Sequence, residues 1–442
     1  MKRKILIAWG NPYSFNESVA PLIPQLAEHF EIFLILSAYH LPPAVEQRLA
    51  SWQREGVIGN WLVAPSHDDI LAMHLFMRSK LDRLRRQNFD VFLAGSMMQV
   101  FERYLLDCVL PKHCVRACFC SDITYLLTHD GLARELLGVG GEKRMPSTGL
   151  EVPRSRAASL KRVVNKVLSR DIISEILFIT KWIRKKIMSR LVWDPWKRVI
   201  TYMNRYILPG FLVGRIFLSR RYDALTQLVT DGFEGLMFCD EIEANAHMAL
   251  YRTDRVHVVQ HPLQGNCRCQ VTERAKTTIL SPLSGFVGMD QLPDKALTLY
   301  CRDLKAVLNG AGASTIHLRL HPRESGRWPH QLQAYLRSQG MDAVVVGCDR
   351  PLREIVCDYQ GVAGFSSCAL RDARAACSRI FVVGFVGVSR YRYHDPKFVY
   401  GKGEGIGWIE EDGSYDPAIF QRNNYTAPQR PSVVEILREL KK

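Results

Sequence analysis

The sequence predicts an α/β fold with two doubly wound parallel sheets. The chain has 442 residues, enough for two or three domains of ~100–200 residues. Short apolar runs alternate with helical stretches, which is typical of βαβ units. A polar stretch without clear period, residues 264–276, separates two such series. With 47% apolar and 23% charged residues, the composition excludes a disordered or collagen-like chain.

The first series forms a predicted N-terminal domain, residues 1–263. Strands are expected at 5–9, 32–36, 91–94 and 115–120 and, beyond a long interruption, at 225–230 and 256–259. Helices are expected near 19–29, 68–86 and 241–250. This alternation places helices between parallel strands of one sheet.

The second series begins after the predicted hinge, residues 264–276, and forms a C-terminal domain, residues 277–425. Strands are expected at 278–280, 316–320, 343–346, 362–365 and 380–383, and helices at 290–308, 331–338, 352–359 and 370–377. Residues 426–442 should contain a short helix that packs back on the body. Such sheets bind ligands beyond the carboxyl ends of their strands, so the loops that follow the strands are searched for chemistry.

The interruption in the first domain is a helical insertion, residues 141–221, that holds most of the net charge of +15. Its part 153–221 contains 17 basic and 3 acidic residues, against 42 basic and 41 acidic residues elsewhere. A basic amphipathic helix with tryptophan at its edges, here Trp182 and Trp193, is typical of proteins that bind an anionic membrane surface. Contact with an anionic polymer and a plain helical hairpin with a solvated face are the alternatives.

The location of the protein follows from its apolar runs. None reaches the ~18–20 residues that cross a bilayer. The apolar run near the start is interpreted as a strand and not a secretion signal, because Asn11, Asn16 and Glu17 end it. We therefore expect a cytoplasmic protein, peripheral on the inner face of the cell membrane. No zinc-finger, RNP-type or helix-turn-helix pattern indicates a nucleic-acid partner.

The twelve cysteines are expected to be buried free thiols in a reducing compartment. Two pairs, Cys118/Cys120 and Cys267/Cys269, have one intervening residue, whereas zinc and redox sites usually have two.

Two loops of the C-terminal domain carry candidate phosphate-binding groups. His321 and Pro322 follow the strand 316–320, and an imidazole at the rim of a sheet can donate a hydrogen bond or a proton to a departing phosphate. Ser366 and Ser367 follow the strand 362–365 and open a helix, where hydroxyls, free N–H groups and the helix dipole favour an anion. A turn histidine and a simple N-cap are the structural alternatives.

Two further loops are less specific. Small residues after the strand 278–280 would let backbone N–H groups approach a phosphate or ribose, from Ser281 to Gly285. Asp231, in Thr230-Asp231-Gly232 after the strand 225–230, can take a proton from an acceptor hydroxyl. Glu234, Asp240 and Glu241 are alternatives for that role, and an ordinary turn explains the Asp-Gly pair equally well.

The order and spacing of these loops resemble the C-terminal half of bacterial sialyltransferases and polysialyltransferases, over residues 225–385. That family has the GT-B fold, with two Rossmann-like domains and a cleft between them. Its motifs are an acidic pair before glycine, a His-Pro pair and a Ser-Ser or Ser-Thr pair. Here they correspond to Thr230-Asp231-Gly232, His321-Pro322 and Ser366-Ser367. Thr230 stands where a carboxylate is expected, which leaves the identity of the base open.

The resemblance implies inverting transfer of sialic acid, or a related CMP-activated nonulosonate or Kdo, onto a bacterial lipopolysaccharide or capsule. Asp231 and His321 would be catalytic. The donor nucleotide would bind to Ser281, Pro282, Ser284, Gly285, Pro322, Arg323, Ser366 and Ser367. The acceptor side would include Gly10, Asn11, Gly232 and Glu234.

No cofactor and no metal is expected beyond the CMP-sugar donor. A monophosphate leaving group has no pyrophosphate for Mg²⁺ to bridge, and the chain has no Asp-x-Asp motif. His321, the paired serines and a helix dipole would instead stabilise the charge that develops on the phosphate.

Two other functions stay open. A CDP-alditol phosphotransferase of the teichoic-acid type also resembles this chain, with His261-Pro262 after the strand 256–259 as its second histidine loop. A non-catalytic glycosyltransferase-like scaffold is the third reading, because the first motif departs from its pattern.

Overall fold

The computed structural model describes thirteen longer stretches and a few short ones, all within one compact unit of the chain. They are residues 2–10, 12–37, 41–65, 83–95, 109–120, 232–241, 253–264, 277–283, 294–321, 328–365, 368–389, 405–421 and 426–440, with 76, 79–80, 105–106, 244–245 and 248. The predicted basic insertion, the predicted strand 225–230 and nearly all of the hinge lie outside these residues, so those predictions and the domain boundaries stay predictions.

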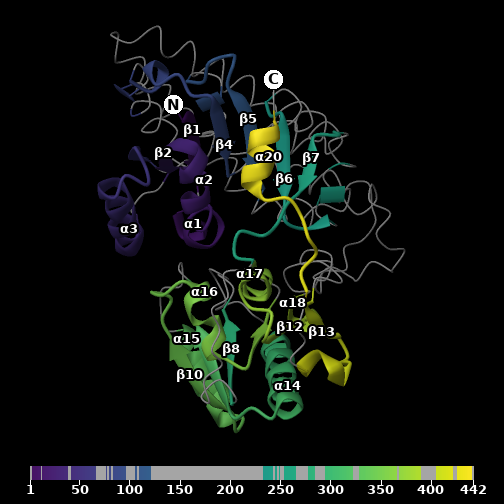
Figure 1. Cartoon of the computed structure of the whole chain (residues 1–442). Coiled ribbons are helices and arrows are strands. Elements are labelled where there is room, and N and C mark those ends of the chain that lie inside the picture. The colour runs from purple at the N-terminus through teal and green to yellow at the C-terminus, as the bar shows by residue number, and fades with distance from the viewer. Residues whose placement is uncertain are drawn as a thin grey trace, which may run out of the picture. The chain divides into compact units, whose positions relative to one another are not determined.

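Seven parallel strands form the first sheet, in the order β3-β2-β1-β4-β5-β6-β7 (Figure 1). They are β1 (Arg3–Trp9), β2 (Phe30–Ser37), β3 (Asn60–Ala64), β4 (Val91–Ala94), β5 (Val115–Phe119), β6 (Gly235–Phe238) and β7 (Val256–Val258). The inner strands are almost continuously apolar because helices cover both faces of a parallel sheet. The strands expected at 5–9, 32–36, 91–94, 115–120 and 256–259 are confirmed, whereas β3 and β6 were not predicted.

Three helices follow the first strands of this sheet. They are α1 (Pro12–Ser18), α2 (Ile23–His29) and α3 (Pro43–Arg54). The helix expected near 19–29 is confirmed as α2, which ends at the expected residue but begins four residues later. Pro21 lies in the turn before it and lacks the N–H that a helix needs, and Pro24 occupies the first turn of α2. Helix α1 was not predicted. Helix α3 buries Val45 and Leu49, which are one turn apart, against the core.

Six parallel strands form the second sheet, in the order β10-β9-β8-β11-β12-β13. They are β8 (Thr278–Pro282), β9 (Thr315–Arg319), β10 (Asp342–Val346), β11 (Gly361–Gly364), β12 (Phe381–Phe385) and β13 (Gly407–Ile409). All five strands expected in this domain are confirmed within a few residues. Strand β8 runs two residues further than expected and so includes Ser281 and Pro282.

Helices cover both faces of the second sheet. One face packs on α14 (Asp294–Ala311) and α15 (Trp328–Ser338), and the other on α16 (Leu352–Ile355), the 3-10 helix η5 (Val356–Asp358) and α17 (Cys368–Ala376). The short helices α18 (Val386–Ser389) and η6 (Pro417–Phe420) follow. The helix expected at 352–359 is therefore broken into α16 and η5.

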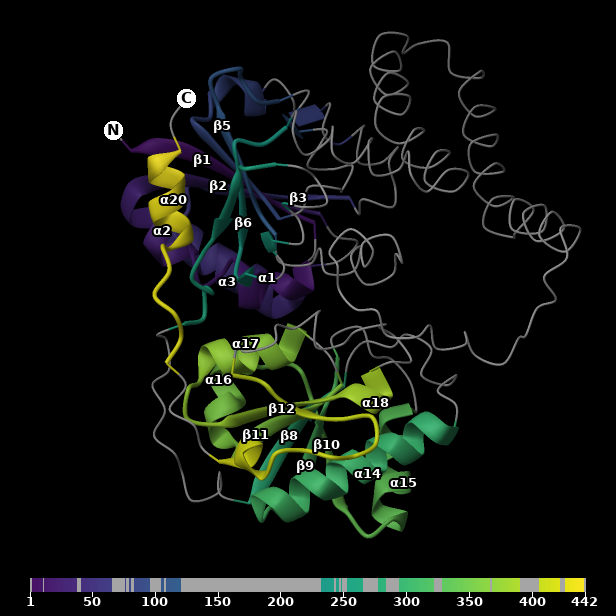
Figure 2. The ribbon, with the colours of Figure 1, turned by 90° about the vertical axis from the view of Figure 1, so that its right-hand side faces the viewer.

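The last helix of the chain, α20 (Val433–Glu439), packs on the first domain, as predicted. Val433, Ile436 and Leu437 share a buried core with residues of β1 and α2. Figures 1 and 2 show this helix, in yellow, beside α2. A capping box fixes its start, because Glu435 N–H donates to Ser432 Oγ while Ser432 N–H donates to the Glu435 carboxylate.

The two sheets share one topology. Each begins with the strand that stands third in its sheet, continues to one edge and then returns to fill the other side, which is the strand order of the Rossmann fold. The predicted α/β class with two doubly wound domains is thus confirmed, and this arrangement is that of the GT-B fold. None of the helices within the described ranges is both long enough and apolar enough to cross a membrane.

The expectation that all twelve cysteines are free thiols is wrong, since Cys357 is disulfide-bonded. Seven other cysteines in the described residues are free, and all of them except Cys348 are buried. Cys118 and Cys120 lie with their sulfur atoms 3.7 Å apart without a disulfide.

Candidate functional site

Each sheet has a switch point, where the strand order reverses and a ligand crevice is expected at the carboxyl ends. In the first sheet this point lies between β1 and β4, and the Trp9 ring packs there so closely on Gly95 that a Cβ would lie 2.4 Å from it. Trp9 is 1% exposed and belongs to the core. The first switch point is therefore filled by a side chain.

In the second sheet the switch point lies between β8 and β11. Gly364 ends β11 there, and a Cβ on it would lie 3.2 Å from Ser281 Oγ and 3.5 Å from the Pro282 carbonyl oxygen. The predicted Ser366-Ser367 pair follows β11 directly and lies outside the described residues.

Strand β9 carries polar groups where an inner parallel strand is normally apolar. Ile316 and Leu318 face one core, while His317 and Arg319 alternate with them on the opposite face. His317 Nδ1 lies 3.1 Å from the Tyr359 hydroxyl, and Arg319 Nη2 donates to the Arg350 carbonyl at 2.7 Å. His321, which is partly buried, comes two residues after Arg319 at the carboxyl end of this strand.

Glu17 of α1 contacts the same end of the second domain. Its Oε1 accepts a hydrogen bond of 2.8 Å from the N–H of Leu352, which opens α16 and has no partner inside that helix. Arg353 donates to the Asn16 carbonyl at 2.6 Å. The second oxygen, Oε2, is buried and accepts no hydrogen bond in the described part of the chain.

The charges around Glu17 oppose one another. Burial is the main cause that raises the pKa of Glu17, and the nearby Asp372 carboxylate adds to it, while the Leu352 N–H, Arg353 and Arg319 act in the other direction. Burial also lowers the pKa of Arg319 and Arg353, and Glu17 is the largest opposing cause for both. An acid on one domain thus faces two partly desolvated guanidinium groups on the other.

His261, after β7, is held in one tautomer by two hydrogen bonds. Its Nδ1 accepts from the Leu263 N–H at 3.2 Å, so Nε2 carries the hydrogen and donates to Asp372 Oδ1 at 3.2 Å. The imidazole therefore serves to join the loop after β7 to α17. Both ring nitrogens are engaged, so His261 in this position is not available as a second catalytic histidine.

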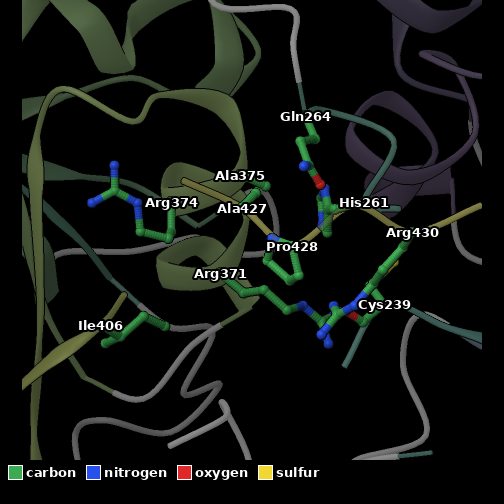
Figure 3. A pocket seen from close by; sticks show the side chains of 10 residues that line it. All are labelled: Cys239, His261, Gln264, Arg371, Arg374, Ala375, Ile406, Ala427, Pro428 and Arg430. Carbon is green, nitrogen blue, oxygen red and sulfur yellow. The ribbon is translucent and has the colours of Figure 1, made fainter. Parts of the chain in front are cut away.

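A small pocket lies beside this pair, and three arginines line it (Figure 3). Arg374 donates to the carbonyls of Ile380 and Cys377, and Arg430 donates to Cys239 O at 2.6 Å and lies 3.4 Å from Glu241 Oε1. In Figure 3, Arg371 and Arg430 extend toward Cys239, whereas Arg374 points away. The guanidinium groups of Arg374 and Arg430 thus hold segments of the chain together.

The predicted donor residues have mixed outcomes. Ser281 is fully buried, and its hydroxyl lies 2.6 Å from that of Tyr300 in α14, so its side chain serves the core. Pro282 closes β8, and His321 lies at the carboxyl edge as expected. The remaining predicted donor residues lie outside the described part of the chain: Ser284, Gly285, Pro322, Arg323, Ser366 and Ser367.

The predicted acceptor-side residues separate into two groups. Gly10 follows β1 at the carboxyl edge, as expected, and Asn11 and Asp231 lie outside the described residues. Gly232 and Glu234 precede β6 and lie at its amino end, and the strand 225–230 expected before them lies outside the described residues. Glu234 N–H donates to the Arg116 carbonyl, and its carboxylate accepts from the Arg116 N–H, at the amino end of β5.

Of the alternative acids, Asp240 and Glu241 follow β6 and lie at its carboxyl end. Asp240 is 4% exposed, and the Glu241 carboxylate is the one near Arg430.

Sequence reasoning missed Glu17, Arg319, Arg353 and Asp372. For Arg319 a signal existed, since the alternation Thr-Ile-His-Leu-Arg puts charge on an inner strand, which should be apolar on both faces. No such signal existed for Glu17, because a single acid eight residues beyond a strand is typical of a solvent-exposed helix position.

No model of a protein family matches this sequence, and no curated protein sequence is similar to it. Among solved structures, Anabaena Alr3699/HepE in complex with UDP and glucose is similar at 10% identity and a TM-score of 0.47, covering 99% of this chain and 98% of its own. A UDP-glucosyltransferase from Polygonum tinctorium is similar at 12% identity and a TM-score of 0.44, over 95% of this chain and 88% of its own. A UDP-N-acetylglucosamine 2-epimerase is similar at 9% identity and a TM-score of 0.45, over 99% of this chain and 94% of its own. These similarities concern the fold, and the three proteins include a glucosyltransferase and an epimerase.

Proposed function

We propose that the protein is an inverting, metal-independent glycosyltransferase that uses a nucleotide-activated sugar. One observation carries this proposal: the carboxyl end of the second sheet presents Arg319 and His321, and a buried acid from the first domain, Glu17, reaches the same end. His321 at this strand end suits a phosphate leaving group, and Glu17 with Arg319 nearby suits an acceptor hydroxyl.

The donor that fits best is a CMP-activated acidic sugar, sialic acid or a related nonulosonate or Kdo. The support is the His321-Pro322 and Ser366-Ser367 loops, which follow β9 and β11, the latter at the switch point of the second sheet. Pro322, Arg323, Ser284 and Gly285 are proposed to line the same nucleotide site.

Transfer would proceed by attack of an acceptor oxygen on the anomeric carbon as the bond to the phosphate breaks. The sugar gains oxocarbenium character and the phosphate gains negative charge. Hydrogen bonds from His321, Ser366 and Ser367, with the dipole of α17, would stabilise that charge in the transition state more than in the bound donor.

The acceptor is proposed to be a bacterial surface glycan, in lipopolysaccharide or capsule. Residues 153–221 would bring the enzyme to an anionic membrane that presents a lipid-linked acceptor, with roughly 1 kcal/mol for each basic residue near the surface. Deletion of residues 155–200 should abolish sedimentation with vesicles that contain anionic lipid. Unchanged sedimentation of the deleted protein would refute the membrane role.

The experiment that tests the function is nucleotide release from a donor panel. Purified protein is incubated with CMP-sialic acid, CMP-Kdo, CDP-glycerol and UDP-glucose, and the free nucleotide is measured, with water as the acceptor where no glycan is known. Release of CMP is expected. Release from CDP-glycerol alone would favour the alditol phosphotransferase, and no release or nucleotide binding would favour a non-catalytic scaffold.

The geometry gives the alditol phosphotransferase no added support. That reading needs His261 as a second catalytic histidine, and both nitrogens of its ring are engaged by Leu263 and Asp372.

A further inference from the structure

Two side chains that bond to the main chain at residues 350–352 each have a buried polar atom without a hydrogen-bond partner. Glu17 Oε2 and Arg319 Nε are both buried and make no hydrogen bond to any of the described residues. A buried acceptor or donor without a partner costs roughly 1–3 kcal/mol, so such pairs in a native protein require an explanation.

The main-chain contacts of the two side chains show that they end close together. The Arg319 guanidinium is bonded to the carbonyl of Arg350, and the Glu17 carboxylate is bonded to the N–H of Leu352. These main-chain groups are two residues apart, a span of at most about 7 Å. The two side chains also interact electrostatically, although they form no direct ion pair.

An acceptor and a donor in the same neighbourhood, each without a hydrogen-bond partner, suit a ligand group that is both donor and acceptor. A hydroxyl is such a group, because its O–H can donate to Glu17 while its lone pairs accept from Arg319. A sugar hydroxyl therefore satisfies both atoms at once, whereas a phosphate oxygen would satisfy only the arginine and be repelled by the carboxylate.

We propose that Glu17 is the catalytic base, and that the acceptor hydroxyl binds between its Oε2 and Arg319 Nε. The proposal rests on the proposed glycosyltransferase function and assigns to Glu17 the role that Thr230-Asp231 left open. In the step, the hydroxyl O–H bond breaks and its proton passes to Glu17. The oxygen forms the new bond to the anomeric carbon, and the electron pair of the broken sugar–phosphate bond leaves on the nucleotide.

The surroundings of Glu17 suit this role. The Leu352 N–H holds Oε1, so Oε2 is oriented. Arg319 from β9, Arg353 from α16 and Asp372 from α17 are the charged groups that act on it, and burial together with Asp372 keeps its affinity for a proton high. A base with raised proton affinity accepts a proton from a hydroxyl more readily.

The test compares Glu17→Gln with Glu354→Gln in nucleotide release by the full chain. Each substitution changes a carboxylate at a contact with α16: Glu17 of α1 bonds to Leu352, and Glu354 of α16 lies 3.7 Å from Arg48 of α3. Only Glu17 has a buried oxygen without a partner. Glu17→Gln keeps an oxygen for the Leu352 N–H. It should lower release by at least ~10²-fold and leave the thermal shift by CMP unchanged, whereas Glu354→Gln should stay within twofold.

Further arms separate the explanations. Formate should restore part of the release by Glu17→Ala. The wild-type kcat/KM should fall toward acid pH with an apparent pKa above 4.5, and this profile serves even if the variants do not fold. The assignment is overturned if Glu17→Gln keeps more than one fifth of wild-type release, or if Glu354→Gln loses as much release as Glu17→Gln. It is also overturned if Asp240→Asn loses release while Glu17→Gln does not, or if the wild-type kcat/KM does not fall toward acid pH. No release by the wild type from any donor would instead overturn the proposed function itself.

Discussion

The two edges of the first sheet use carboxylates in opposite ways. At the carboxyl edge, Glu17 is drawn into contact with the second domain, and one of its oxygens is buried without a partner. At the amino edge, Glu234 is exposed and closes a two-way hydrogen bond with the Arg116 main chain. The four residues of β6 separate Glu234 from the carboxyl edge by about 13 Å. Position along the strand, more than residue type, thus distinguishes a reactive acid from a structural one.

The largest expected effect on nucleotide release comes from His321, at the carboxyl end of its strand, in comparison with His257, inside β7. His321→Ala should lower nucleotide release by ~10²-fold or more, because it removes a donor to the charge on the leaving phosphate. His257→Ala, within β7, should stay within about threefold, since that ring lies in the body of the sheet. Equal losses in the two variants would show that the carboxyl edge is not special.

Two glycines test how tightly each edge is packed. Gly95→Ala should lower the free energy of unfolding by about 1–3 kcal/mol, because the new Cβ meets the rigid Trp9 ring. Gly235→Ala, at the amino edge, should change it by less than about 1 kcal/mol, because its neighbour is the flexible end of Leu440. Urea denaturation measures both, and a reversed order would contradict the packing.

The pH dependence of stability should differ in sign between two glutamates. Burial raises the pKa of Glu17, so its contribution to stability is fully present below 4.5 and is lost as the pH rises through the folded-state pKa. The Ser432 N–H lowers the pKa of Glu435, so its contribution is present above 4.5 and is lost as the pH falls through the folded-state pKa.

Melting curves between pH 3 and 8 measure this difference. Relative to Glu17→Gln, wild-type Tm should rise as the pH falls from 7 toward 4.5. Relative to Glu435→Gln, the wild-type advantage should shrink only below 4.5. Parallel curves for wild type and Glu17→Gln would show that Glu17 is not a strained buried acid.

The smallest effect is expected at the amino edge. Glu234→Gln retains an oxygen that accepts from the Arg116 N–H, and the side chain is exposed. Nucleotide release should stay within twofold of wild type. A loss as large as that of Glu17→Gln would return the acceptor role to the region around Asp231.

The sequence by itself determined most of the strands of both sheets. Buried parallel strands are short, apolar and bounded by turns, so β1, β2, β4, β5, β7 and the second-sheet strands β8 to β12 were recognisable from local pattern alone, whereas β13 was not predicted. It also placed His321 at a strand end. It failed where local pattern is ambiguous, as at Pro21, which divides α1 from α2, and at β6, whose apolar run lies a few residues beyond the Asp-Gly turn.

Only the tertiary structure decided which polar residues meet. Glu17 and Leu352 are 335 positions apart in the chain, and His261 and Asp372 are 111 apart, so no spacing rule connects them. The tertiary structure also decided the role of Ser281, whose hydroxyl was expected to bind a nucleotide and instead hydrogen-bonds to the Tyr300 hydroxyl. Strand formation depends on each segment's own apolar surface, whereas a site depends on the topology that brings distant strand ends to one edge.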